Sequence, residues 1–134
     1  MDCIFCKIIK GEVPCSKVYE DDDVLAFLDI SPNNKGHTLV IPKQHHETIL
    51  DIPDELLKKV IMLVKKVSIV LKKDSDGINI LQNNYKPGGQ LVPHIHFHII
   101  PRFENDNHKF EWSHIKYEDG EVEQYRQKIE NLLK

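Results

Sequence analysis

Residues 94–100 read His-Ile-His-Phe-His-Ile-Ile, and the rest of the chain is best interpreted outward from them. Side chains alternate between the two faces of a strand, so His94, His96 and His98 are predicted to share one face. The alternating apolar residues share the other face and fit a protein core. Three imidazoles in a row gain nothing from β-propensity, so the pattern indicates a functional strand, which we expect Pro101 to end.

The flanking sequence predicts an antiparallel sheet and a long helix. Short apolar runs bounded by turn residues predict four more strands, at residues 17–20, 24–29, 38–41 and 78–82. From Asp54 to Lys73, apolar residues fall at helical spacing and lysine pairs recur every seven residues on the other face. Residues 3–10 predict one or two helical turns, and residues 121–134 a weaker helix. The class is therefore α+β, with a five-stranded antiparallel sheet, one long helix and a C-terminal helix.

Composition excludes several classes of protein. The 134 residues suit one domain, 1–134, with a core at 3–102 and a C-terminal tail at 103–134. The formal net charge of −3 argues against a DNA or RNA partner, and lysine pairs interrupt the longest apolar runs, so no membrane partner is expected. Asp2 stands where a signal peptide would carry basic residues, which predicts a cytoplasmic protein. In a cytoplasmic protein, the spacing Cys3-x-x-Cys6 is typical of a metal half-site or a redox pair, or of two buried cysteines.

The histidine row suits two chemistries. Three histidines can bind a catalytic metal that keeps an open position, or one imidazole can act as a nucleophile while the others position an anionic substrate. Alternate residues of one flat strand do not converge easily on one ion, which favours the nucleophile. The preceding Gly88-Gly89-Gln90 also favours it, because glycine lets backbone N–H groups approach a phosphate closely.

At this point the chain resembles the histidine triad (HIT) family of nucleotidyl hydrolases and transferases, most closely its Hint-like bacterial and archaeal branch. The residues that carry the resemblance are the histidine row with Gly89-Gln90 before it and Pro101-Arg102 after it, together with residues 3–9, 24–32 and 36–45. The resemblance implies the HIT-like fold and a homodimer. It also implies cleavage of a purine nucleotide conjugate, such as a nucleoside phosphoramidate, at its α-phosphate through a covalent nucleotidyl-histidine.

The family's roles can be placed on this sequence. The resemblance implies that His96 is the nucleophile and that His98 binds an α-phosphate oxygen. It implies that Asp29 binds the ribose, although a turn-capping aspartate is the alternative. The other nucleotide-binding residues that it implies hold the phosphate or line the base pocket: Asn83, Gly89 and Gln90, and Ile4, Phe5, Ile8, Phe27 and Ile30.

The resemblance also completes the metal half-site. It implies that His45 and His94 join Cys3 and Cys6 in a structural Cys₂His₂ zinc site, which removes His94 from catalysis, and it implies no organic cofactor. Cys15 has no evident partner, and His37 is expected to be a structural histidine.

The loop before the histidine row departs from the family at Leu91, and Pro93 in the same loop lacks a backbone N–H. Leu91 stands where the family carries Ser or Thr, whose hydroxyl assists the leaving group. This departure keeps two alternatives open, a dinucleoside polyphosphate hydrolase and a nucleotide-binding or interaction module with little turnover.

Overall fold

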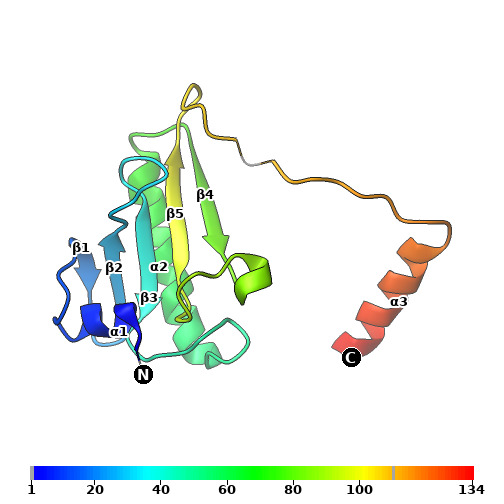
Figure 1. Ribbon diagram of the computed structural model, residues 1–134, viewed down its shortest axis with the longest axis horizontal. Coiled ribbons are helices and arrows are strands. Elements are labelled where there is room, and N and C mark those ends of the chain that lie inside the picture. The colour runs from blue at the N-terminus through cyan, green and yellow to red at the C-terminus, as the bar shows by residue number, and fades with distance from the viewer. Residues whose placement is uncertain (1, 110) are drawn as a thin grey trace.

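The computed structural model describes residues 2–109 and 111–134, so Met1 and Phe110 of the expected domain lie outside the described residues. Five strands form one antiparallel sheet in the order β1-β2-β3-β5-β4 (Figure 1). Their bounds are β1 (Lys17–Glu20), β2 (Val24–Leu28), β3 (Thr38–Pro42), β4 (Gly77–Gln82) and β5 (Phe97–Arg102). The helices are α1 (Ile4–Ile9), α2 (Asp54–Lys72), α3 (Glu121–Leu133) and the 3₁₀ turn η1 (Lys86–Gly88). This arrangement confirms the predicted fold class.

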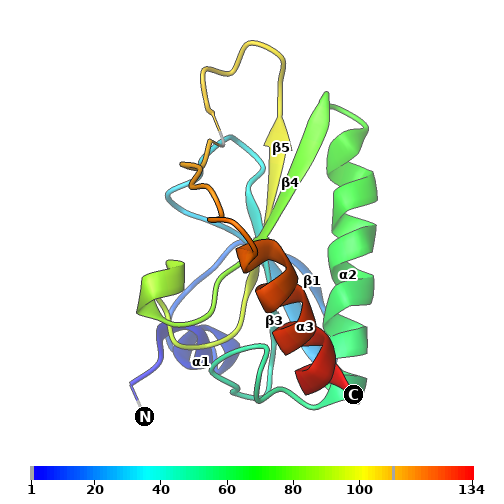
Figure 2. The ribbon, with the colours of Figure 1, turned by 90° about the vertical axis from the view of Figure 1, so that its right-hand side faces the viewer.

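The sheet is covered on both faces. Helix α2 lies along one face (Figure 2), and between them lies a core that includes Val24, Val40 and Val64. Helix α1 packs on the other face against Leu25, Phe27 and other residues of the same strands. Because both faces are buried, β2 is apolar throughout and β3 is apolar from Leu39 onward, instead of alternating.

The predicted strand at 94–100 is wrong at both ends. Strand β5 begins at Phe97 because the chain before it bonds to the loop after β3: the N–H of Ile95 donates to the carbonyl of His46 at 2.8 Å. The strand continues through Pro101, because its pairing with β3 ends at Ile99 while its pairing with β4 reaches Arg102. Beyond Ile99 the strand has β4 alone as its partner, and a proline is tolerated on such an edge.

The predicted sharing of faces is correct for the apolar residues. Ile95, Phe97 and Ile99 all lie in the core beneath α2.

Within the described residues, no helix has the length and apolar character that crossing a membrane requires.

The C-terminal helix stands apart from the rest of the structure. After β5 and a turn held by an Arg102–Asp106 ion pair of 2.9 Å, the chain leaves the sheet and reaches α3, which has no buried residue (Figure 1). The described tail thus contributes nothing to either core.

Candidate functional site

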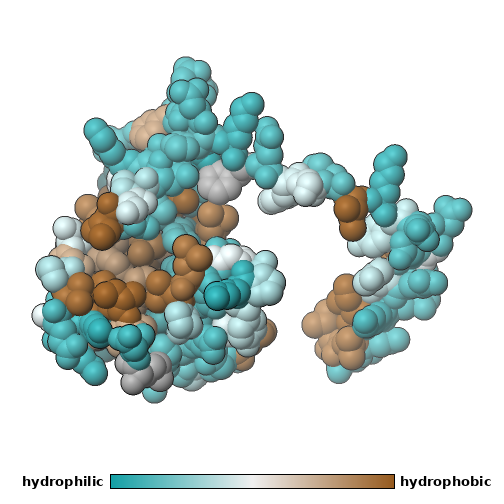
Figure 3. Space-filling model, in the orientation of Figure 1, coloured by the Kyte–Doolittle hydropathy of each residue, from teal (hydrophilic) through white to brown (hydrophobic). Residues whose placement is uncertain are grey.

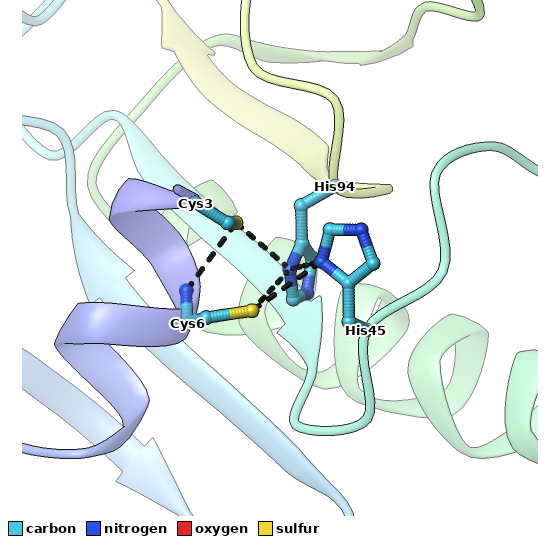
Figure 4. Close-up of side chains that lie close together, drawn as sticks. All are labelled: Cys3, Cys6, His45 and His94. Atoms are coloured by element: carbon cyan, nitrogen blue, oxygen red, sulfur yellow. Dashed lines mark hydrogen bonds between the residues drawn. The ribbon is translucent and has the colours of Figure 1, made fainter. Parts of the chain in front are cut away.

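Four side chains from three separate segments converge beside the start of β5. Cys3 is the N-cap residue of α1 and Cys6 lies in the first turn of that helix, whereas His45 comes from the loop after β3 and His94 from the segment before β5 (Figure 4). One donor atom from each lies within 4.8 Å of the other three. The two histidine Nδ1 atoms are 3.1 Å apart, and Cys6 Sγ lies 3.3 Å from His45 Nδ1 and 3.7 Å from His94 Nδ1.

These separations fit a tetrahedral zinc site. Bonds of about 2.3 Å to sulfur and about 2.05 Å to nitrogen would place two nitrogens about 3.4 Å apart and sulfur and nitrogen about 3.6 Å apart. The ring of His94 is oriented for this role, because its Nε2–H donates to the carbonyl of Pro42 at 2.9 Å and so leaves the Nδ1 lone pair facing the cysteines. The cluster can therefore hold a metal, and all four of its positions come from the protein.

His96 is held with one nitrogen occupied and the other available. Its Nδ1–H donates to the carbonyl of His94 at 2.7 Å, so Nε2 carries the lone pair. Phe5 contacts the imidazole edge-on, with ring centroids 5.0 Å apart. Burial lowers the pKa of His96 below its ordinary value, partly offset by its hydrogen bond to the His94 carbonyl. The ring is therefore neutral near pH 7, as a nucleophile must be.

His98 is oriented by His37, which the sequence interpretation took for a structural residue. The backbone N–H of Asn33 donates to His37 Nδ1 at 3.0 Å, which leaves the proton of neutral His37 on Nε2. That Nε2 lies 2.9 Å from His98 Nδ1, so His37 donates and the proton of His98 is on its own Nε2. Burial, together with the nearby His96 and His37, lowers the pKa of His98 to about 4. His98 thus offers an N–H donor without a positive charge.

Strand pairing was the signal that could have identified His37. Leu39 pairs with His98 across β3 and β5, and His37 precedes Leu39 by two residues, so its side chain lies on the same face as His98. Burial lowers the pKa of His37, against an opposing effect of Asp29. The two histidines therefore form a neutral pair.

Asp29 lies beside this pair. Its Oδ1 accepts from the N–H of Ser31 at 2.8 Å, which is the turn-capping role, and its Oδ2 lies 3.7 Å from His37 Nε2. Asp29, His37 and His98 form a second group whose potential ligand atoms lie within 4.8 Å of one another.

The predicted base-pocket residues divide into two groups. Phe5, Ile8 and Phe27 are buried in the core beside α1, and Phe5 and Phe27 pack edge to face at 5.6 Å. Ile4 is exposed, and Ile30 is 93% exposed, so the structure does not bring Ile30 to the buried group. Their part in binding a base stays a prediction.

The side chain of Gln90 fixes the predicted phosphate loop through two hydrogen bonds. Gln90 is 5% exposed and both ends of its amide are occupied: Oε1 accepts from the N–H of Tyr85 at 2.7 Å, and Nε2 donates to the carbonyl of Glu47 at 2.6 Å. Gln90 therefore anchors the loop. Gly89 has a φ of 94°, and a Cβ there would come within 3.4 Å of the Asn83 side chain, so the loop favours glycine. Leu91 follows and is 90% exposed.

The chain matches known proteins over most of its length. A family model described as the HIT domain matches residues 10–105. An uncharacterised HIT-like protein of Methanocaldococcus jannaschii is 55% identical over 87% of this chain and 92% of its own. A Schizosaccharomyces pombe protein named adenosine 5'-monophosphoramidase is 49% identical over 76% of this chain and 75% of its own. An Arabidopsis thaliana protein named adenylylsulfatase is 47% identical over 78% of this chain and 54% of its own.

Solved structures agree with the fold. A HIT family protein of Bacillus subtilis is 42% identical, with a TM-score of 0.89 over 98% of this chain and 96% of its own. A structure described as a Zn-bound histidine triad family protein of Mycobacterium smegmatis is 33% identical, with a TM-score of 0.78 over 100% of this chain and 99% of its own.

Proposed function

Because this chain belongs to the HIT domain family, we propose that it is a hydrolase that cleaves purine nucleotide conjugates of the phosphoramidate type at the α-phosphorus. The observation that carries the proposal is the state of His96, a buried neutral imidazole whose Nδ1–H is committed to the His94 carbonyl and whose Nε2 is free to attack. Relatives named adenosine 5'-monophosphoramidase support the substrate class.

The reaction takes two displacements. His96 Nε2 forms a bond to the α-phosphorus while the bond to the leaving group breaks; its electron pair departs with that group, and an amine leaving group takes a proton from solvent as it departs. The positive charge that develops on the imidazole is stabilised by the hydrogen bond from Nδ1–H to the His94 carbonyl at 2.7 Å. The His98 Nε2–H, oriented by His37, donates to a phosphate oxygen, and water then displaces the imidazole and releases the nucleoside monophosphate.

Intact-mass spectrometry tests the chemistry directly. We expect an adenylyl adduct and AMP release when the protein reacts with adenosine phosphoramidate and is quenched without acid. His96→Gly should lose both, and the exposed control His108→Gly should keep both. A wild-type protein that releases AMP without an adduct, or a His96→Gly variant that still turns over, would overturn the assignment of His96.

Leu91 favours a second candidate, a dinucleoside polyphosphate hydrolase. An amine must gain a proton to depart, whereas a nucleoside phosphate leaves as a stable anion, and Leu91 supplies no hydroxyl to assist. Comparing kcat/KM for diadenosine tetraphosphate and adenosine phosphoramidate separates the two. A higher kcat/KM for diadenosine tetraphosphate than for adenosine phosphoramidate would favour the second candidate.

The cofactor and the location are part of the same proposal. We assign a structural zinc to Cys3, Cys6, His45 and His94, which would fix α1 to the segment carrying the nucleophile, and we assign no organic cofactor. Thiolate ligands of this kind suit a reducing compartment, so we place the protein in the cytoplasm, with no nucleic-acid or membrane partner. We also propose that residues 1–134 form one domain, with a core at 3–102 and a C-terminal tail at 103–134.

We also infer a homodimer. Among the described residues, strand β4 ends the sheet, so one side of its backbone has no strand paired to it there. Beside it, α2 and β4 form an apolar groove of about 540 Å³ whose lining includes Ile61, Ile69 and Ile80, each about half exposed. An apolar surface that reaches the edge of a sheet fits a second copy of the same surface.

A further inference from the structure

We propose that a cavity between β1 and α2 binds an unbranched aliphatic monocarboxylate of medium chain length. The cavity has a volume of about 300 Å³, a size within the range of small-molecule sites. It lies at the β1 edge of the sheet, whereas the proposed dimer interface lies at the β4 edge. The inference therefore stands apart from both the proposed hydrolase and the proposed homodimer.

A β-bulge in β1 forms one wall of the cavity. The pairing of β1 with β2 advances by two residues in β1, from Lys17 to Tyr19, but by only one residue in β2. Val18 is therefore the extra residue of a bulge. Neighbouring residues of a regular strand point to opposite faces, yet Val18 and Tyr19 both line the cavity. The bulge thus directs two consecutive side chains to the α2 face of the sheet.

The other walls are mostly aliphatic. Helix α2 supplies Val67, Val70 and Leu71, and β2 supplies Leu28. Val18, Leu28 and Val70 remain exposed, so the chain's own packing leaves apolar surface here in contact with water. An apolar ligand would remove that surface from water. A methylene group fills about as much space as a water molecule, about 30 Å³, so the cavity suits a chain of about eight to ten carbons.

Lys66 supplies the charge that selects the end of the ligand. Thr38 and Tyr19 also line the cavity, but their hydroxyl groups donate elsewhere: Thr38 to the carbonyl of Gly36 at 2.8 Å, and Tyr19 to Asp21 Oδ2 at 3.0 Å. The ammonium group of Lys66 has no hydrogen bond or ion pair within residues 2–109 and 111–134. One cation beside an aliphatic cavity complements an apolar chain that ends in one negative charge.

The neighbouring lysines are already paired. Lys66 also lines a second hollow, together with Lys58 and Lys59. Lys58 forms an ion pair with Glu55 at 2.8 Å. Lys59 forms one with Asp23 at 2.7 Å. Lys66 is therefore the lysine of this hollow that can bind a carboxylate without breaking an existing ion pair of the described chain.

The candidate site lies on the other face of the same strands. Leu28 and Gly36 line the cavity, and the residues that follow them in the chain are Asp29 and His37. Figure 3 looks onto the face that carries α1 and shows that apolar atoms gather on that face as well. An apolar probe therefore has two surfaces available to it, and an experiment has to establish which one it occupies.

Methyl-group NMR with octanoate as the probe locates the ligand. We expect saturable shifts of the methyl groups of Val67, Val70 and Leu71, nuclear Overhauser contacts from these methyl groups to the octanoate chain, and no displacement of octanoate by AMP. A lack of saturable shifts at the cavity would overturn the proposal. Shifts at Ile8 in their place, or displacement by AMP, would put the probe on the α1 face and overturn it as well.

The neutral probe 1-octanol tests the role of Lys66. Lys66→Met keeps an apolar stem but removes the charge, so the Kd for octanoate should rise about fivefold, as loss of an exposed ion pair allows, while the Kd for octanol stays within about twofold. Lys73→Met removes a charge at the end of the same helix and should leave both Kd values unchanged. Equal effects of Lys66→Met on the two probes, or no effect on either, would overturn the assignment of a carboxylate ligand.

Substitutions of Val70 test where the chain of the ligand lies. Val70→Glu places a carboxylate in the wall at an exposed helical position, so both probes should bind about tenfold more weakly. Val70→Leu keeps the wall apolar and should stay within about threefold of wild type. Unchanged octanoate binding by folded Val70→Glu would contradict the placement. These binding measurements do not depend on turnover or on the dimer, so they remain valid if either of those proposals fails.

Discussion

Replacing His37 tests how the tautomer of His98 is set. His37→Ala removes the Nε2–H that donates to His98 Nδ1 over 2.9 Å. The proton of His98 can then occupy either nitrogen, and the molecules that carry it on Nδ1 lose their donor to the phosphate. A buried hydrogen bond of this kind contributes about 1 to 1.5 kcal/mol, and about 1.4 kcal/mol is a factor of ten in rate. We therefore expect kcat/KM for AMP release to fall about tenfold.

A conservative variant separates positioning from packing. His37 is buried, so His37→Ala also leaves a cavity. In His37→Gln the terminal amide N–H extends about as far as Nε2 and can donate to the same atom, so kcat/KM should stay within about threefold of wild type. Urea unfolding of each variant identifies any loss that comes from stability, and the exposed His108→Ala serves as the control.

Nuclear magnetic resonance gives a readout that packing alone would not change. The ¹⁵N shifts of the imidazole nitrogens distinguish protonated from unprotonated atoms, and wild-type His98 should carry its proton on Nε2. The reasoning is refuted if the proton is on Nδ1, if His37→Ala retains full kcat/KM, or if a folded His37→Gln loses as much as His37→Ala.

Three further predictions address metal, pH and core. Metal analysis should find one zinc per chain, and Cys6→Ser should lose the zinc and have a lower Tm. Turnover per folded Cys6→Ser molecule at low temperature should stay within about threefold of wild type. A loss of all turnover in folded protein would contradict a structural role for the zinc. The folded chain holds His98 at a pKa of about 4 and the unfolded chain at about 6.5, so the unfolded state binds more protons between these values and stability falls as pH falls. By pH 4.5 this effect should cost about 2.5 kcal/mol in urea unfolding, and His98→Asn should make the dependence shallower without abolishing it, because burial also lowers the pKa of His37 and of His96. Ile99→Ala, at a fully buried position, should cost about 3 kcal/mol, whereas Ile80→Ala, at a half-exposed one, should cost under about 1 kcal/mol.

The sequence predicted features that depend on local periodicity. The alternation at 94–100 placed Ile95, Phe97 and Ile99 correctly in the core, and helical spacing found α2. It could not place the start of β5, because a ladder depends on where the partner strand ends, and the segment before Phe97 bonds to a loop instead. Periodicity within one strand says nothing about its neighbour across the sheet.

The site was predictable where the resemblance supplied its distant partners. It brought Cys3 and Cys6 together with His45 and His94, and the structure places the four side by side. It did not anticipate that Gln90 is committed to the carbonyl of Glu47, 43 residues earlier, or that His37 contacts His98, 61 residues later. Each of these pairs forms only once the sheet and its loops are in place, so each needed three-dimensional information.

His94 belongs to two sites through two different groups. Its imidazole faces the cysteines, while its carbonyl holds the proton of His96. A substitution of His94 that kept metal affinity but shifted this backbone would displace the nucleophile, His96, two residues further along the chain. Within the part of the chain that the structure describes, Cys3, Cys6 and His45 make no hydrogen bond to His96, so exchanging one of them for another zinc-binding side chain leaves this backbone contact in place. The metal preference of the site can therefore be changed by substitutions at Cys3, Cys6 or His45, whereas His94 must be kept.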